Sequence, residues 1–361
     1  MSNTELSELH VKNILNKISS KKNLTYPDAI VIFKNIVEGR IQDYYSTSIL
    51  KEISRKGETV DEILAMVQII KELSITIHPN IKNNIFDICG TGGSKIKTFN
   101  ISTASAIVAA SAGCNIAKHG NRAVSGICGS ADFLEYIGLN LSNPPHVVSS
   151  CIEELGIGFL FAPLFHPVLK NVSKLRKEIG MKTIFNIAAP LCNPCDNLSG
   201  QIIGIYDSSL LHKFAEVTKK LNRNFILVNS NDGIDEISTT CVNEIIRVNK
   251  GEIIKFNVNP REVGIPLASV NNITIKNKED SIELTLKSIY GVARKEIEDI
   301  VALNSSSVLV LSEIAKNLQE GIDISRSVIR EGKARKKLED LITFCGNKER
   351  LYEIEKKFDL T

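Results

Sequence analysis

The sequence predicts an α/β protein in which a small all-helical N-terminal domain is hinged to a larger domain with a mostly parallel central sheet. Apolar side chains recur at helical spacing up to about residue 71, with no strand signal among them. From about residue 85, short apolar runs alternate with helical segments, which is typical of a parallel sheet covered on both faces. The length of 361 residues also suits two domains.

Four helices are expected in the N-terminal domain. The first carries apolar residues between Leu6 and Ile18 at helical spacing. The second is expected to begin near Thr25, with Pro27 in its first turn, and to end at Gly39. Two more are expected at 49–54 and 60–73. We expect this domain to span residues 1–78, joined by helices around 166–182.

The α/β domain is expected to span residues 79–361. Its strands are expected at the short apolar runs 85–88, 115–117, 158–161, 225–228 and 253–258. Helices are expected between them, at 101–112 and 133–137 among others, and one after another from about residue 281 to the end. His166 precedes a proline, so we expect it to pack at a helix start; a general-base role is the less favoured alternative.

Composition narrows the class of protein. Hydrophobic residues make up 43% and charged residues 24%, which excludes a disordered or low-complexity chain. A net charge of +3 is small for a nucleic-acid-binding protein. No apolar run approaches the ~20 residues of a membrane helix, and the start lacks an apolar signal core. We therefore expect a cytoplasmic protein with reduced thiols, and no zinc or redox site at Cys192 and Cys195.

A glycine-rich loop follows the first expected strand, in the run Asp87-Ile-Cys-Gly-Thr-Gly-Gly-Ser94. Glycine lets backbone N–H groups approach an anion, and the next helix adds a positive dipole end. The loop is neither a Walker A motif nor Gly-x-Gly-x-x-Gly. On its own it is as compatible with a plain tight turn as with a phosphate cradle.

A second polar loop, Lys118-His-Gly-Asn-Arg122, follows the next expected strand, with Ser125, Gly126, Gly129 and Ser130 behind it. Ligands of open α/β sheets bind at the carboxyl ends of strands. Lysine supplies a point charge and arginine a planar fork, and both suit phosphate oxygens. We therefore favour a phosphate site over the alternative, a solvated basic turn.

A third loop is acidic, with the run Asp232-Gly-Ile-Asp-Glu236. Asp235 and Glu236 are adjacent like charges, which are costly to hold in a cleft without a cation. Mg²⁺ takes one or two carboxylates together with substrate phosphates. An isolated acidic turn is more often solvated, but beside a phosphate cradle the pair predicts a Mg²⁺ site. Arg176 is a candidate for binding a carboxylate, although most helical arginines are simply exposed.

Together these runs closely resemble the anthranilate phosphoribosyltransferase family. The matching segments occur in the family's order over nearly the whole chain: 87–93, 98–103, 118–122, 129–132, 162–166, 176, 183–186, 190–194, 232–238 and 259–264. The resemblance implies transfer of phosphoribose from phosphoribosyl pyrophosphate (PRPP) to the amine of anthranilate, a step of tryptophan biosynthesis that releases pyrophosphate. It also implies the fold of the pyrimidine nucleoside phosphorylases and a homodimer formed through the helical domain.

The resemblance further implies the residues of the site. By matched position, PRPP would be held by Gly90, Gly92, Gly93, Ser94, Thr98, Asn100, Ile101, Ser102, Thr103, Lys118, His119, Gly120, Asn121, Arg122, Ala123, Val124, Ser125, Gly126 and Ser130. Mg²⁺ would be held by Ser102, Asp235 and Glu236, and anthranilate by Gly90, Asn121 and Arg176. Lys118 and Arg176 would be the catalytic residues.

The chemistry fits these residue types. An aromatic amine is already a nucleophile, so the reaction needs no Ser–His or Cys–His pair. It needs stabilisation of a pyrophosphate leaving group and of a cation-like sugar carbon, which Mg²⁺, backbone N–H groups and Lys118 can supply. Positioning of the amine close to the sugar carbon, and domain closure that excludes water, would supply the remaining rate acceleration.

Three positions depart from the family pattern, and two alternatives stay open. Ser94 stands where the family usually has Asp, Gly126 replaces a Ser, and Val228-Asn229-Ser230 replaces Val-His-Gly. A nucleoside phosphorylase of the same fold is the first alternative, although Asn121, Arg176 and the acidic pair argue against it. A non-catalytic nucleic-acid-binding paralogue is the second, although the modest net charge and intact acidic pair argue against it.

Overall fold

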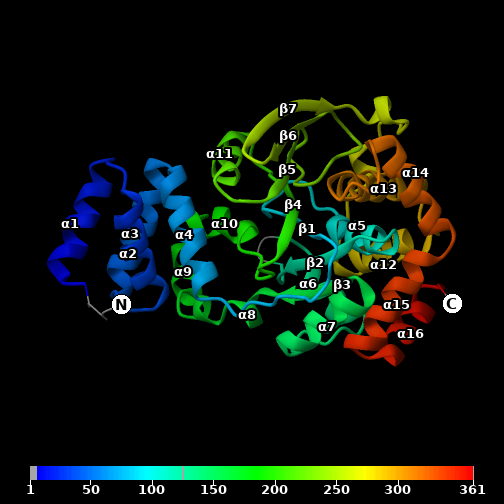
Figure 1. Ribbon diagram of the computed structural model, residues 1–361, viewed down its shortest axis with the longest axis horizontal. Helices are drawn as coiled ribbons and strands as arrows, with labels where there is room; N and C mark the ends of the chain where they lie inside the picture. Colours follow the sequence, from blue (N-terminus) through cyan, green and yellow to red (C-terminus); the bar gives the residue numbers. More distant parts are fainter. Residues whose placement is uncertain (1–5, 124–125, 361) are drawn as a thin grey trace. The chain divides into compact units, whose positions relative to one another are not determined.

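The computed structural model describes residues 6–123 and 126–360, and the chain divides into two compact units. The helical unit consists of Met1–Ile75 and Pro163–Pro194, and the sheet unit of Thr76–Ala162 and Cys195–Thr361. The predicted site residues Val124 and Ser125 fall outside the described residues. Figure 1 traces both units along the sequence from blue to red.

The helical unit is built from short amphipathic helices. Their bounds are α1 Glu8–Ser19, α2 Tyr26–Val37, α3 Asp43–Lys56, α4 Val60–Glu72, α9 Ser173–Ile179 and α10 Ile184–Ala188, with α8 at Ala162–Phe165 and 3₁₀ turns at Pro167–Lys170 and Ala189–Leu191. The side chains of Ser7, Thr25 and Thr59 accept hydrogen bonds at the starts of α1, α2 and α4. These caps explain why the predicted starts near 25 and 60 agree with the structure.

Helix α3 begins earlier than the sequence predicted, at Asp43 instead of residue 49. Its first turns expose a polar face, and its buried face begins only at Ser46, Ile49 and Leu50. The start of a helix that is exposed on most sides shows little hydrophobic periodicity. Apolar spacing alone therefore located only the packed part of the helix.

His166 packs inside the helical unit, as expected from its place before a proline. Its side chain is 3% exposed, and its Nδ1 lies 2.6 Å from Ser74 Oγ. The neighbouring Ile75 N–H donates to the Phe165 carbonyl at 2.8 Å. Burial lowers the pKa of His166 to about 4, so the ring is neutral in the folded protein near pH 7.

We expect this burial to make folding pH-dependent. Between about pH 6.5 and 4 the unfolded chain binds a proton that folded His166 does not, so stability is lost as pH falls, by up to roughly 3 kcal/mol. The urea midpoint should therefore fall over this window, and fall less in His166→Asn. The exposed His10 on α1 gives the control, His10→Asn. An equal pH slope in native protein and His166→Asn would contradict this assignment.

The sheet unit is built on seven strands, and the predicted mostly parallel α/β architecture is confirmed. The strands are β1 Ile85–Gly90, β2 Asn115–Gly120, β3 Ile157–Phe161, β4 Leu198–Gly204, β5 Asn224–Ser230, β6 Asn243–Asn249 and β7 Glu252–Val258. Their order is β3-β2-β1-β4-β5-β6-β7. The pairs from β3 to β5 are parallel, and β6 and β7 extend the sheet as antiparallel neighbours.

The helices of this unit pack on the strands or on one another. They are α5 Ile101–Ser111, α6 Ser130–Tyr136, α7 Pro145–Leu155, α11 Ser208–Lys219, α12 Lys278–Tyr290, α13 Lys295–Leu311, α14 Leu318–Arg330, α15 Lys333–Cys345 and α16 Lys348–Lys357, with 3₁₀ turns at Pro260–Val263 and Val270–Asn272. Helix α5 is almost entirely buried and contacts β1, β2, α12, α13 and α15 (Figure 1). Its small Ala and Ser side chains allow this close packing on all sides.

Among the described residues, no helix combines the length and the apolar character that crossing a bilayer requires.

Candidate functional site

The strand order places a topological switch point between β1 and β4. From β1 the chain proceeds to β2 and β3 on one side, and then continues with β4 on the other side of β1. Crevices at such points, at the carboxyl ends of the strands, are where open α/β sheets bind ligands. The glycine-rich loop follows β1 and the acidic loop follows β5, whereas residues 118–120 of the second predicted loop form the end of β2 and only the residues after them leave the strand. All three predicted loops thus lie at the carboxyl edge of one sheet.

The glycine-rich loop and the acidic loop contact each other directly. The Gly92 N–H donates to Asp235 Oδ2 at 2.7 Å, and Ser94 Oγ donates to the Gly233 carbonyl at 3.1 Å. A Cβ at Gly90 would lie 2.2 Å from Asp235 Oδ2, so no larger residue fits there without a shift. Glycine at position 90 is therefore explained by the approach of the Asp235 carboxylate.

Gly204, at the end of β4, is a site residue that the sequence reasoning missed. A Cβ there would lie 1.7 Å from the Asp235 carbonyl oxygen, so the acidic loop crosses directly over this glycine. The Thr91 N–H also donates to the Gly204 carbonyl, at 2.8 Å. The only signal in the sequence is a glycine that closes the apolar run at 202–203.

Lys118 is a buried cation beneath these loops. It is 3% exposed, and its Nζ donates to the Ile88 carbonyl at 2.7 Å and to Ser102 Oγ at 3.4 Å. The Ser102 N–H, in the first turn of α5, donates to Glu236 Oε1 at 3.2 Å. Lys118, Ser102 and Glu236 therefore form a continuous polar chain that links β2, the start of α5 and the acidic loop.

The Glu236 carboxylate is electrostatically strained in the absence of a cation. Burial, followed by the neighbouring charge of Asp235, raises the pKa of Glu236 to about 8, and Lys118 opposes this shift. Two carboxylates and the Ser102 hydroxyl are oxygen donors of the kind that Mg²⁺ prefers. The described residues hold no group of three or more His, Cys, Asp or Glu side chains that could enclose a metal. This donor set fits a Mg²⁺ ion that takes its other ligands from substrate and water.

The loop after β2 is held by Asp132 at the start of α6. Asp132 Oδ2 accepts from the Ala123 and Gly129 N–H groups, each at 2.9 Å. Burial on its own would raise the pKa of Asp132, but the two backbone hydrogen bonds favour the charged carboxylate, and the pKa lies below its usual value. A Cβ at Gly129 would lie 2.4 Å from Ala123 N, so glycine is required for the turn to close.

Arg122 is engaged by a carboxylate instead of pointing freely into the site. Its Nη1 lies 2.5 Å and its Nη2 2.8 Å from the two carboxylate oxygens of Glu135, and its guanidinium lies 5.6 Å from the centre of the Phe161 ring. The Glu135 hydrogen bond raises the pKa of Arg122. Binding of a phosphate by this fork would require it to share or exchange Glu135.

The remaining predicted PRPP residues lie in the loop after β1, at the end of β2, in the segment that leads into α5 and its first turn, and in the segment up to the start of α6. The Asn100 Nδ2 donates to Ser281 Oγ at 3.2 Å, and the His119 N–H donates to Asp87 Oδ1 at 3.3 Å. Asn121 accepts from the Arg122 N–H at 2.8 Å. The others are Gly93, Thr98, Ile101, Thr103, Gly120, Gly126 and Ser130, of which Ile101 and Thr103 are buried.

Arg176 belongs to the helical unit, unlike the other predicted site residues, which belong to the sheet unit. It lies on α9, partly buried, with its guanidinium 5.3 Å from the centre of the Phe185 ring. Burial lowers the pKa of Arg176 from its usual value. A stacked and partly desolvated guanidinium is suited to a planar anion, and its pairing with Asn121 around anthranilate stays a prediction.

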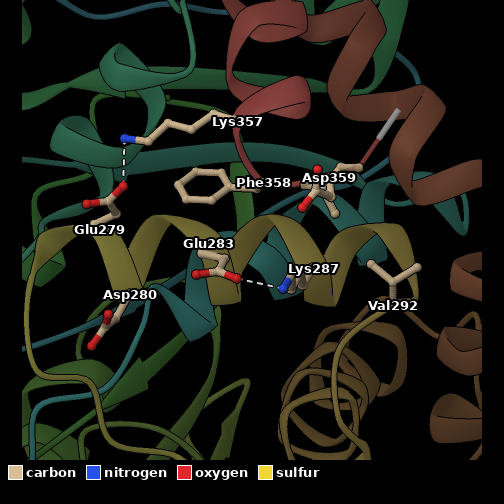
Figure 2. A pocket seen from close by; sticks show the side chains of 9 residues that line it. Glu279, Asp280, Glu283, Lys287, Val292, Lys357, Phe358 and Asp359 are labelled. Carbon is tan, nitrogen blue, oxygen red and sulfur yellow. Dashed lines mark hydrogen bonds and ion pairs between the residues drawn. The ribbon is translucent and has the colours of Figure 1, made fainter.

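An open groove elsewhere on the sheet unit shows none of this chemistry. It lies between α12 and the C-terminal segment, has a volume of about 540 Å³, and is lined by charged side chains (Figure 2). Glu279 pairs with Lys357 and Glu283 with Lys287, each at 2.6 Å. These two pairs hold four of the charged side chains that line the groove, and the groove contains neither the glycine-rich loop nor the acidic loop.

Comparison with known proteins agrees with the two-unit architecture. Residues 82–335 match the glycosyl transferase family, a/b domain, and residues 12–74 match the helical bundle domain of the glycosyl transferase family. The chain is 38% identical over 338 residues to an anthranilate phosphoribosyltransferase of Acetivibrio thermocellus, covering 93% of this chain and 97% of the relative. It is 35% identical over 345 residues to that of Nitrosopumilus maritimus, covering 95% and 99%.

Solved structures show the same likeness. The anthranilate phosphoribosyltransferase of Thermus thermophilus superposes with a TM-score of 0.85 at 31% identity, covering 92% of this chain and 99% of that chain. The enzyme of Saccharomyces cerevisiae, solved in complex with PRPP and Mg, has a TM-score of 0.84 at 23% identity, covering 95% and 99%, and shares the fold. From the matched domains and these full-length relatives, the chain belongs to the glycosyl transferase family and, within it, to the anthranilate phosphoribosyltransferases.

Proposed function

We propose that this protein transfers the phosphoribosyl group of PRPP to the amine of anthranilate, giving N-(5-phosphoribosyl)anthranilate and pyrophosphate in tryptophan biosynthesis. The observation that carries the proposal is the junction of three loops at the carboxyl edge of the sheet. There the Gly92 N–H meets Asp235 at 2.7 Å, and Lys118 is joined through Ser102 to Glu236. This junction brings a buried lysine and a carboxylate pair together at the carboxyl edge of the sheet, where the Gly92 and Ser102 N–H groups bind the two carboxylates.

PRPP would bind along the strand ends and the start of α5. The proposed residues are Gly90, Gly92, Gly93, Ser94, Thr98, Asn100, Ile101, Ser102, Thr103, Lys118, His119, Gly120, Asn121, Arg122, Ala123, Val124, Ser125, Gly126 and Ser130. Backbone N–H groups at the N-terminus of α5 favour anions. Of the departures from the family pattern, Ser94 hydrogen-bonds to Gly233 and Asn229 to the Ile205 carbonyl at 2.7 Å, so both have structural roles here.

Mg²⁺ would be held by Asp235, Glu236 and Ser102 together with phosphate oxygens of PRPP. The support is the strained Glu236 carboxylate, whose charge a cation would stabilise. The yeast enzyme that shares the fold was solved with PRPP and Mg. When bound, the ion would neutralise charge that develops on the departing pyrophosphate.

Other residues of the chain would stabilise charge in the transition state and bind anthranilate. Lys118 would stabilise negative charge in a site of low dielectric, where a fixed ammonium is worth more than in water. Gly90 and Asn121 would contact anthranilate, and Arg176 would bind its carboxylate. Anthranilate's amine is nucleophilic without a base, so holding it close to the sugar carbon would supply much of the remaining acceleration.

The first test is the reaction itself. Purified protein should consume anthranilate, followed by its fluorescence, only when both PRPP and Mg²⁺ are present. Omission of either component and chelation by EDTA are the controls, and a pyrimidine nucleoside with inorganic phosphate tests the phosphorylase alternative. Unchanged fluorescence at high enzyme concentration would overturn the proposal, and nucleoside cleavage without anthranilate transfer would favour the phosphorylase.

We further propose a cytoplasmic homodimer formed through the helical unit. All eight cysteines are free, which fits a reducing compartment. Leu9 on α1 and Tyr44 on α3 are 70% and 72% exposed, and these two helices pack against each other, so both side chains would be available to an interface. Sedimentation velocity would report the oligomeric state, and Leu9→Lys should shift it toward monomer.

A further inference from the structure

The turn that carries Asp235 and Glu236 is anchored by a side chain from a distant helix. The next residue, Ile237, is fully buried, and both of its backbone polar groups bind Asn304 on α13. The Ile237 N–H donates to Asn304 Oδ1 at 2.9 Å, and Asn304 Nδ2 donates to the Ile237 carbonyl at 2.9 Å. One amide side chain therefore binds both backbone polar groups of the residue that follows the carboxylate pair.

The position of Asn304 is not explained by packing. It stands inside a 17-residue helix whose neighbours Ile300, Val301 and Leu303 are buried apolar side chains, and asparagine is a poor residue for a helix interior. It is 1% exposed, so an unpaired amide would be costly. Its Nδ2 also donates to the Ile300 carbonyl, at 2.8 Å, so the amide is fully engaged between its own helix and the turn.

The other side of the turn is held by residues of β5 and β6. Ser230 Oγ lies 2.5 Å from the Glu236 carbonyl oxygen and 2.5 Å from Asn243 Oδ1, and its single proton can serve either. Asn243 in turn accepts from the Ser238 N–H at 2.7 Å and donates to the Ser238 carbonyl at 2.9 Å. The backbone at residues 236–238 is thus bound from two directions.

The Glu236 carboxylate is held by α5, which packs against α13. Helix α13 packs along α5, and the Ser102 N–H at the start of α5 donates to Glu236 Oε1. The backbone of the turn is therefore tied to α13 through Asn304, while the side chain is tied to α5 through Ser102. Loss of the Asn304 amide would remove the tie between the backbone of the turn and α13, while the contacts of Ser102, Ser230 and Asn243 would remain.

We propose that Asn304 is a positioning residue that holds Asp235 and Glu236 in the arrangement that binds a divalent cation. The inference rests on the proposed function, in which this pair binds Mg²⁺ with PRPP. Asn304 acts through the backbone of Ile237 and touches neither substrate nor metal. Outer-shell groups that orient ligands typically change metal affinity by about 10–100-fold when they are removed.

The test is the binding of Mn²⁺, as a stand-in for Mg²⁺, followed by electron paramagnetic resonance with PRPP present and anthranilate absent. Asn304→Ala should raise the Kd for Mn²⁺ about 10–100-fold, and should raise the Mg²⁺ concentration for half-maximal rate to match. The KM for anthranilate should change by no more than about twofold, because Asn304 has no proposed contact with that substrate.

Ser307→Ala is the matched control, because Ser307 is 1% exposed on the same helix and donates to the Asn304 carbonyl within α13. It should lower the melting temperature without changing Mn²⁺ binding. Asn304→Asp keeps the acceptor for the Ile237 N–H but replaces the donor, and should also weaken Mn²⁺ binding. Because Asn304→Asp is nearly isosteric, it tests whether Asn304 affects Mn²⁺ binding if Asn304→Ala does not fold.

Two negative results have different meanings. If native protein binds Mn²⁺ no better with PRPP than without it, the proposed metal site fails, and the role of Asn304 fails with it. If native protein binds Mn²⁺ with PRPP and both Asn304 variants bind it equally well, the positioning role alone is overturned. If Asn304→Ala lowers the melting temperature as much as Ser307→Ala does and leaves the Mn²⁺ affinity unchanged, Asn304 contributes to the stability of the fold and not to metal binding.

Discussion

Replacing Asp235 by Asn together with Glu236 by Gln is expected to lower kcat/KM for PRPP by at least about 100-fold and to flatten its dependence on Mg²⁺. A catalytic cation contributes several kcal/mol of charge stabilisation, and each 1.4 kcal/mol is about tenfold in rate. The carboxamides keep the shape of both side chains and remove their charges, and the oxygen that each retains can still accept the hydrogen bond from Gly92 or Ser102. Initial rates across a Mg²⁺ titration, at saturating anthranilate, measure the effect.

The same variant should fold at least as stably as the native protein. Burial and the charge of Asp235 already raise the pKa of Glu236, so removing the charges relieves an unfavourable interaction. Glu244→Gln removes a carboxylate of β6 that pairs with Lys255 at 2.6 Å, and should leave the Mg²⁺ titration unchanged. An undiminished Mg²⁺ dependence in the double variant would show that the acidic pair does not hold the ion.

Arg176→Ala is expected to raise the KM for anthranilate by roughly 30- to 1000-fold and to leave the KM for PRPP nearly unchanged. Loss of a partly desolvated, bidentate partner of a carboxylate costs about 2–4 kcal/mol. The stacking of Arg176 on Phe185 holds the fork in place before substrate arrives, so little additional ordering is needed on binding. Steady-state kinetics with each substrate varied in turn separate the two KM values.

Two variants sharpen that experiment. Lys177→Ala removes an exposed cation from the next position of α9 and should change neither KM by more than about twofold. Arg176→Lys keeps the charge but loses the planar fork, so its effect should lie between those of Lys177→Ala and Arg176→Ala. Equal losses for anthranilate and PRPP in Arg176→Ala would indicate a general disturbance of the helical unit instead of carboxylate binding.

Local signals in the sequence predicted most of the fold. The cap at Thr25 and the capping box of Thr59 with Glu62 are complete within four residues, so neighbouring letters suffice to locate α2 and α4. Strand β4 was missed because Gly200 and Gly204 weaken its strand pattern. A Cβ at Gly200 would lie 3.1 Å from Leu311 and from Phe86. Glycine at this position is therefore favoured by close contacts with residues that lie far away in the sequence.

In the candidate site, too, the contacts between residues distant in the sequence could not be predicted from local patterns. The three loops were predicted from their residue types, but the sequence did not indicate that the Gly92 N–H of the glycine-rich loop donates to Asp235 of the acidic loop. That contact joins residues 143 positions apart, and no local pattern encodes it. Arg122 was predicted as a phosphate-binding fork, and its pairing with Glu135 depends on the orientation of α6. Residue types therefore indicated the chemistry, while the pairings required the fold.

The division of the helical unit into two stretches of chain has a consequence for synthesis on the ribosome. Residues 163–194 complete a unit whose first part, residues 1–75, is translated earlier. The Phe165 carbonyl that accepts from the Ile75 N–H, and the Asn171 amide that donates to the Val37 carbonyl, emerge only after β1, β2 and β3 have been made. The N-terminal helices must therefore avoid aggregation while the first strands leave the exit tunnel, and a fragment that ends before residue 163 would lack the segment that closes them.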